Sequence, residues 1–83
     1  MEGSIDRVMR AKGRMLCGAD WDGLRQQLRD GEHLVACIQD TATGAERIVT
    51  LESQTQWHTI RTLSRTVTVL GYFSTPEPME ANM

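Results

Sequence analysis

The feature that most constrains this chain is a pair of apolar segments separated by a short polar stretch. Residues 33–39 hold the longest apolar run of the sequence, and residues 47–51 form a second run rich in β-branched residues. The stretch 41–45 between them is small and polar, and Gly44 suits a turn with positive φ. We therefore predict an antiparallel hairpin. Because residues 34–38 are apolar at every position, both faces of the first strand must be covered, either by helices or by helices and a partner.

Two helices are predicted before this hairpin. The first spans about residues 5–16, with Ser4 as its N-cap, because its apolar residues recur at helical spacing (Ile5, Val8, Met9, Met15 and Leu16). The second spans about residues 21–30, where Asp20 can cap the start and Gly31 can follow the end. We expect both helices to pack on the hairpin.

The segment 53–65 can be interpreted in two ways. Ser53 and Gln56 form a capping-box pattern, and Trp57, Ile60 and Leu63 then recur every three residues, which favours a helix. Three threonines in the segment are β-branched and favour a strand instead. We expect a helix, because the strand alternative separates apolar from polar residues poorly.

The C-terminal part combines a clear strand with a segment that lacks periodicity. Residues 66–73 are β-branched and aromatic, which is typical of a strand. Residues 74–83 hold both prolines, and we expect a disordered or loosely attached tail. The chain is therefore predicted to form one small two-layer α+β domain over residues 1–73. Its element order is α-α-β-β-α-β, and helices pack on a three-stranded, mainly antiparallel sheet.

The size of the chain suggests self-association. A domain of 83 residues buries a modest share of its surface and is marginal alone. Helices on one side of a three-stranded sheet leave the other side open, and a second copy related by a two-fold axis could cover it. Edge-to-edge pairing of strand 66–73 is the other route. We therefore predict a homodimer.

The residues that could carry catalysis or bind a metal lack the spacing that these sites need. The candidates are Cys17, His33, Cys37 and His58, with the neighbouring acids Asp20 and Asp22. No pair has the spacing of a zinc site, and no catalytic motif or glycine-rich phosphate loop is present. Asp20 and Asp22 are better explained by helix capping. We expect no enzymatic activity, no cofactor and no metal.

The sequence contains no signal-peptide pattern at its N-terminus, and its longest apolar run is far short of the ~18 residues that span a bilayer. We therefore expect a cytoplasmic protein without membrane association, whose two cysteines are reduced.

Aromatic and arginine side chains indicate binding of another protein. Trp57, His58, Arg61 and Arg65 could form one patch of the residue types enriched at interface centres. We predict a non-enzymatic module that binds another protein as an inhibitor or adaptor.

The alternative is a small nucleic-acid-binding regulator. Arg7, Arg10 and Arg14 would form a row on the first helix, and such rows can neutralise phosphates. The net charge of −2 and the absence of a nucleic-acid-binding motif make this alternative the weaker one.

Overall fold

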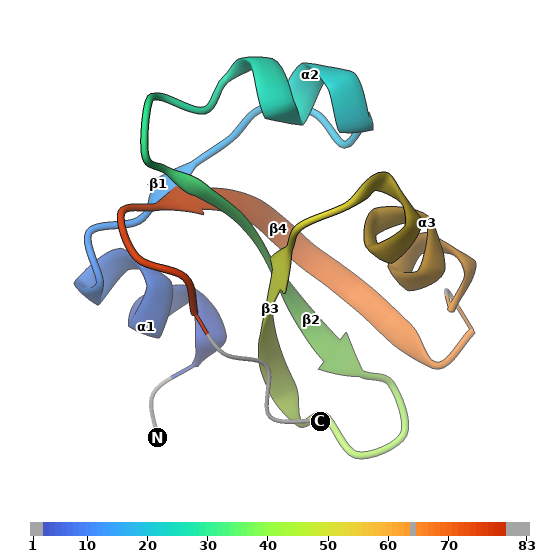
Figure 1. The fold of residues 1–83 in the computed structure, drawn as a ribbon. Helices are drawn as coiled ribbons and strands as arrows, with labels where there is room; N and C mark the ends of the chain where they lie inside the picture. The colour runs from blue at the N-terminus through green and yellow to red at the C-terminus, as the bar shows by residue number, and fades with distance from the viewer. Residues whose placement is uncertain (1–2, 64, 80–83) are drawn as a thin grey trace.

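The computed structural model describes residues 3–63 and 65–79 of the chain (Figure 1). The elements are α1 (Ser4–Arg10), β1 (Arg14–Met15), α2 (Trp21–Gln26), β2 (His33–Asp40), β3 (Glu46–Leu51), α3 (Gln54–Thr62) and β4 (Val67–Thr75). The strands form one antiparallel sheet in the order β1-β4-β2-β3. The α+β class is therefore confirmed, whereas the prediction of three strands and of the order α-α-β-β-α-β is wrong.

The predicted hairpin is confirmed by the pairing of β2 with β3, in which Leu34 lies opposite Leu51 and Gln39 opposite Glu46. The Asp40 carboxylate accepts hydrogen bonds from the backbone N–H groups of Ala42 and Thr43, at 2.8 and 3.0 Å. Gly44 adopts a φ of 76°. The turn therefore uses the one glycine that the sequence offers for a left-handed conformation.

The extra strand arises because α1 is much shorter than the predicted helix 5–16. Its end is a Schellman motif: the N–H of Gly13 donates to the Val8 carbonyl at 2.8 Å, and that of Lys12 donates to the Met9 carbonyl at 3.1 Å. Lys12 takes the left-handed position, with a φ of 66°. The chain then turns into β1, which pairs with the end of β4.

The start of α1 also differs from the prediction. Gly3 is the N-cap, and Ser4 lies inside the helix, where it is buried. The Ser4 hydroxyl and N–H both donate to the Glu46 carboxylate, at 2.7 and 2.8 Å. Ser4 therefore joins α1 to β3 instead of capping the helix. These hydrogen bonds hold the pKa of Glu46 below its usual value.

The other two helices begin where predicted. The Asp20 side chain accepts from the N–H of Gly23 at the start of α2, which ends at Gln26 and is shorter than the predicted range 21–30. Ser53 and Gln56 form the full capping box at the start of α3. Segment 54–62 is therefore helical, and the strand alternative is wrong.

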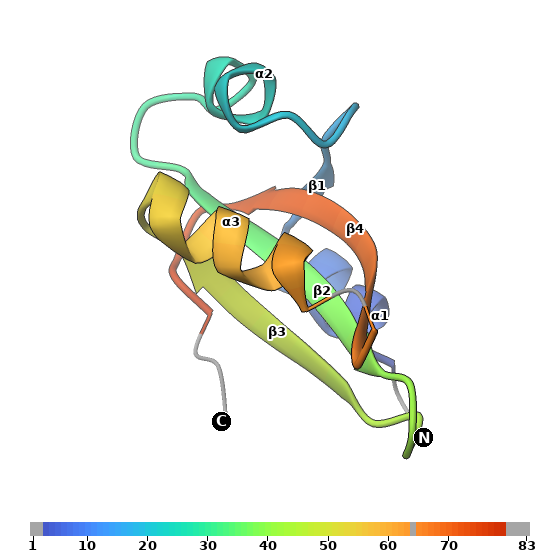
Figure 2. The ribbon, with the colours of Figure 1, turned by 90° about the vertical axis from the view of Figure 1, so that its right-hand side faces the viewer.

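Helices cover both faces of the sheet, so the predicted two-layer arrangement is wrong (Figure 2). On one face, α2 and α3 pack over a cluster that includes Leu24, Ile60 and Tyr72. On the other face, Val8 of α1 packs on a cluster that includes Cys37 and Phe73. The alternating side chains of β2 contribute to both clusters, which explains why residues 34–38 are apolar throughout. The prediction of a homodimer rested in part on an open face, which α1 covers. Its other route, edge-to-edge pairing of strand 66–73, stays a prediction.

The predicted domain boundary at residue 73 falls inside β4, which continues through Ser74 and Thr75. Both residues are buried, and Met79 packs beside the cluster under α1. Residues 80–83 of the predicted tail lie outside the described residues. None of the helices in the described ranges has the length and apolar character required to cross a bilayer.

Candidate protein-binding site

The structure distributes the predicted binding residues over separate parts of the fold. Trp57, His58 and Arg61 lie on α3, and Arg65 lies in the turn that leads into β4. The other arginines divide between α1, which carries Arg7 and Arg10, and β1, which carries Arg14. The row of three arginines predicted on one helix is therefore wrong, because that helix ends at Arg10.

Arg14 joins β1 to the segment after α2. Its guanidinium Nη2 lies 2.8 Å from the Glu32 carboxylate and donates to the Gln27 carbonyl at 3.0 Å. The Glu32 carboxylate also accepts from the backbone N–H of Arg29 at 2.8 Å. That backbone hydrogen bond, together with Arg14, holds the pKa of Glu32 below its usual value. Arg14 is thus engaged within the fold.

The patch around Trp57 is larger than the sequence analysis predicted, because α2 contributes to it. The Trp57 and Trp21 rings lie 6.3 Å apart and are tilted by 48°, a geometry that favours aromatic contact. The guanidinium of Arg61 lies 5.0 Å from the centre of the Trp57 ring, and that of Arg25 lies 5.7 Å from the Trp21 ring. Each pair is within cation–π range. We call Trp21, Arg25, Trp57, His58 and Arg61 the Trp–Arg surface.

A hydrogen-bonded link through Ala19 fixes the two halves of the Trp–Arg surface. The indole N–H of Trp57 donates to the Ala19 carbonyl at 2.9 Å, and the Arg61 guanidinium donates to the same oxygen at 3.3 Å. Ala19 comes just before Asp20, the residue that caps α2. Side-chain hydrogen bonds from α3 to the backbone just before α2 therefore connect the two helices, in addition to the packed rings.

The two halves of the Trp–Arg surface share one sequence spacing. In each helix an arginine follows a tryptophan by four residues, which places it one turn further on the same side. In each helix the residue just before that arginine is buried: Leu24 in α2 and Ile60 in α3. Trp21 and Arg25 were not among the predicted site residues, although the repeated Trp-x-x-x-Arg spacing could have identified them.

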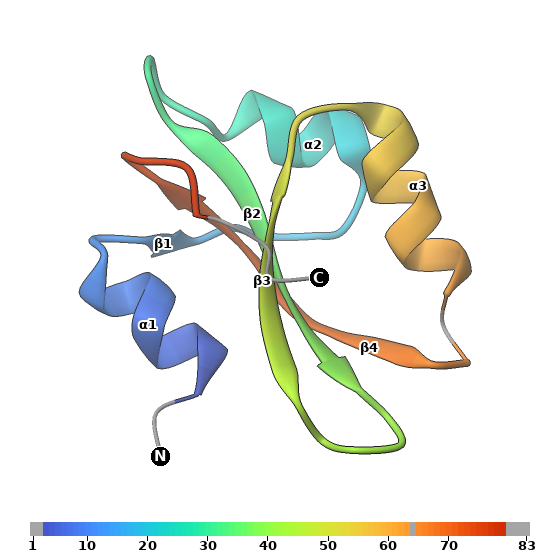
Figure 3. The same ribbon diagram turned by 60° about the horizontal axis from the view of Figure 1, so that its bottom comes forward.

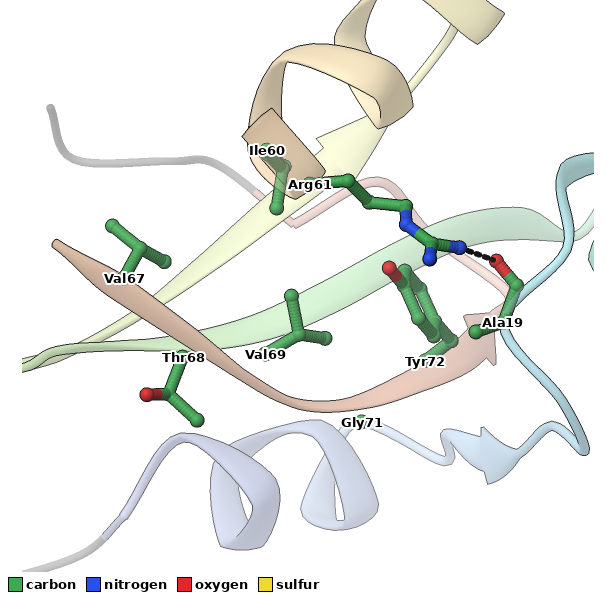
Figure 4. Close-up of a pocket in the computed structure, with 8 residues that line it drawn as sticks. All are labelled: Ala19, Ile60, Arg61, Val67, Thr68, Val69, Gly71 and Tyr72. Atoms are coloured by element: carbon green, nitrogen blue, oxygen red, sulfur yellow. Dashed lines mark hydrogen bonds between the residues drawn. The ribbon is translucent and has the colours of Figure 1, made fainter. Parts of the chain in front are cut away.

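A groove adjoins the Trp–Arg surface between α3 and β4 (Figure 4). It has a volume of about 450 Å³, and Arg61 lies at the end nearest Ala19, above the Tyr72 ring. Burial raises the pKa of the Tyr72 hydroxyl, and the charge of Arg61 opposes this shift. The groove therefore has a largely apolar lining and carries the positive charge of Arg61 at one end.

The residues considered for catalysis or metal binding are not gathered at this surface. Cys17 is exposed, whereas Cys37 is buried under α1, and both are free. Burial raises the pKa of the Cys37 thiol, which disfavours the nucleophilic thiolate. Within residues 3–63 and 65–79, no three His, Cys, Asp or Glu side chains come together as a metal site.

Comparisons of the chain with protein-family models, with curated proteins and with solved structures gave no match. The candidate function therefore rests on the geometry of the Trp–Arg surface.

Proposed function

We propose that this protein is a non-enzymatic module that binds another protein, as an inhibitor or adaptor, through the Trp–Arg surface. The observation that carries the proposal is the pair of half-buried tryptophans, Trp21 and Trp57, each with an exposed arginine over its ring. Tryptophan and arginine are the residue types most enriched among residues that dominate binding energy. Their rings and guanidinium groups lie next to each other across two helices.

The arrangement of this surface also suits binding because it is already ordered. The shared hydrogen bonds to the Ala19 carbonyl fix Trp57 and Arg61, so few rotamers need to be frozen when a partner binds. The free thiols of Cys17 and Cys37 support a reducing compartment, and we propose that the protein acts in the cytoplasm.

The proposal is tested by capture of partners with immobilised protein from the native host. The surface variant carries Arg25→Ala and Arg61→Ala, and the matched control carries Arg29→Ala and Arg47→Ala, two exposed arginines outside the surface. We expect a protein that binds the wild type and the control and is lost with the surface variant. Thermal melting of each variant checks that the fold is retained.

Two results would contradict the proposal. One is capture of no protein by the wild type, and the other is equal capture by all three forms. A titration with DNA and RNA at two salt concentrations accompanies the experiment. Tight binding that weakens steeply with salt, without a captured protein, would favour the nucleic-acid alternative.

A further inference from the structure

The outer edge of β4 is paired along only part of its length. β1 pairs with Phe73 and Ser74, and the N–H of Leu16 donates to the Tyr72 carbonyl at 2.9 Å. The chain then leaves the sheet toward α2, as Figure 3 shows. Among the described residues, no strand lies against the outer side of the segment 67–71. Residues 67 and 69 face outward on this edge, and the N–H of Val67 already donates to the Leu63 carbonyl at 2.9 Å. The groups available to another strand are therefore the Val67 carbonyl and the N–H and carbonyl of Val69.

This free edge lacks two of the features with which proteins usually block strand pairing, charged residues and proline, although it has a third, a β-bulge. The segment 67–71 is Val-Thr-Val-Leu-Gly and contains no charged residue and no proline. A register shift opposite Cys37 and Ile38 leaves Leu70 as the extra residue of a bulge. Val67, Thr68 and Val69 precede the bulge and keep regular pairing with β2.

The free edge borders the groove that adjoins the Trp–Arg surface. Val67 and Val69 project toward α3 and line the groove with Ile60, whereas Thr68 projects to the other side (Figure 4). Side chains alternate along a strand, so every second residue of an added strand would face the same way as Val67 and Val69. The groove provides apolar contacts for those residues.

Charge indicates which kind of strand this edge would accept. Arg61 lies at one end of the groove, and Arg65 is exposed just before β4 begins at the other end. Neither arginine pairs with a carboxylate among the described residues. A partner segment with Asp or Glu could form charge-assisted hydrogen bonds with one of them.

A second copy of this chain fits the same edge less well. In an antiparallel two-fold pairing of this edge, the segment 66–71 of one copy would lie against the same segment of the other. That segment contains no Asp or Glu, so neither Arg61 nor Arg65 would gain a carboxylate from it.

We propose that an extended segment of a partner protein, with alternating apolar side chains and at least one carboxylate, adds as a strand to the outer edge of β4 at Val67–Val69. This inference rests on the proposed function and names the form and chemistry of the partner. Backbone hydrogen bonds along the edge supply affinity, while the groove and Arg61 select the side chains.

The test uses peptides selected on the full-length protein from a library of random twelve-residue peptides. We expect enrichment of sequences in which Asp or Glu stands among alternating β-branched residues. A selected peptide should slow the exchange of the outward-facing Val69 amide by at least tenfold. Arg61→Gln should weaken its binding about tenfold. Arg29→Gln is the matched control, because Arg29 is exposed and lies outside both the groove and the Trp–Arg surface, and it should change affinity less than twofold.

Failure of this inference can be told apart from failure of the proposed function. Peptides that bind without protecting the Val69 amide, and whose affinity falls equally with Arg25→Gln and Arg61→Gln, would overturn strand addition but support binding by the Trp–Arg surface. Protection of this amide on dimerisation of the protein alone would assign the edge to a second copy and also overturn the inference. Failure to enrich any peptide would overturn it as well, while the partner-capture experiment decides the proposed function.

Discussion

Lys12 and Gly13 lie where α1 ends and the chain turns toward β1, and substituting them tests this change of direction. If the helix continued to residue 16, as the apolar periodicity predicts, Gly13→Ala would stabilise it by about 1 kcal/mol and Lys12→Gly would destabilise it by a similar amount. The structure predicts the opposite sign for both substitutions.

The magnitudes follow from the geometry of the turn. A Cβ atom at Gly13 would lie 2.4 Å from Cγ1 of Val8 and 2.6 Å from the Val8 carbonyl oxygen. Val8 is fully buried, so the clash cannot be relieved by a surface side chain, and we expect a loss of about 1–3 kcal/mol. Lys12 has a φ of 66°, a strained conformation that glycine adopts without cost. Glycine also increases the entropy of the unfolded state, so we expect a net rise of about 0.5–1 kcal/mol in the free energy of unfolding.

Urea unfolding followed by far-ultraviolet circular dichroism measures both effects. Gly13→Ala should lower the unfolding midpoint, and Lys12→Gly should raise it. Gly23→Ala is the control, because a Cβ at this position inside α2 meets only the Asp20 side chain, with the nearest atom at 3.2 Å. Stabilisation by Gly13→Ala together with destabilisation by Lys12→Gly would refute the turn and, with it, β1.

Three further predictions concern single side chains. Ser53→Ala removes the cap of α3 and should lower the free energy of unfolding by about 1 kcal/mol in the same assay; an unchanged value would contradict the capping box. Because hydrogen bonds from Ser4 lower the pKa of Glu46, this residue stabilises the fold above the unfolded carboxyl pKa of about 4.3, and that contribution is lost as the pH falls through the folded value. Glu46→Gln should therefore flatten the dependence of stability on pH from about pH 6 to about pH 3, and an unaltered slope would assign the dependence to other groups. Iodoacetamide should alkylate the exposed Cys17 of the native protein and spare the buried Cys37, and mass spectrometry showing equal modification would contradict the packing of α1.

Local signals in the sequence predicted the hairpin and the starts of two helices correctly. Asp20, Ser53 and Gly44 act through contacts within a few residues, so their roles can be inferred without knowledge of the fold. The end of α1 was not predictable in this way. The Schellman motif puts Lys12, not Gly13, in the left-handed position, and the gain that offsets this strain comes from pairing β1 with distant β4.

The candidate site was predictable only where its residues lie close together in the sequence. Trp57 and Arg61 share a helix, so their spacing indicated one patch. The contribution of Trp21 depends on the packing of α2 beside α3, which connects residues far apart in the sequence. Part of the β4 edge is free because β1 has only two residues. This strand could not be predicted, because residues 5–16 have the apolar periodicity of a helix.

The most direct test of the proposed function is the dissociation constant of the captured partner, measured by titration calorimetry with the wild type, Arg25→Ala/Arg61→Ala and Arg29→Ala/Arg47→Ala. Residues that dominate an interface each contribute more than about 1 kcal/mol, so the surface variant should bind at least about tenfold more weakly. The control should bind as the wild type does. Equal affinity of all three forms would contradict the claim that this protein acts through its Trp–Arg surface.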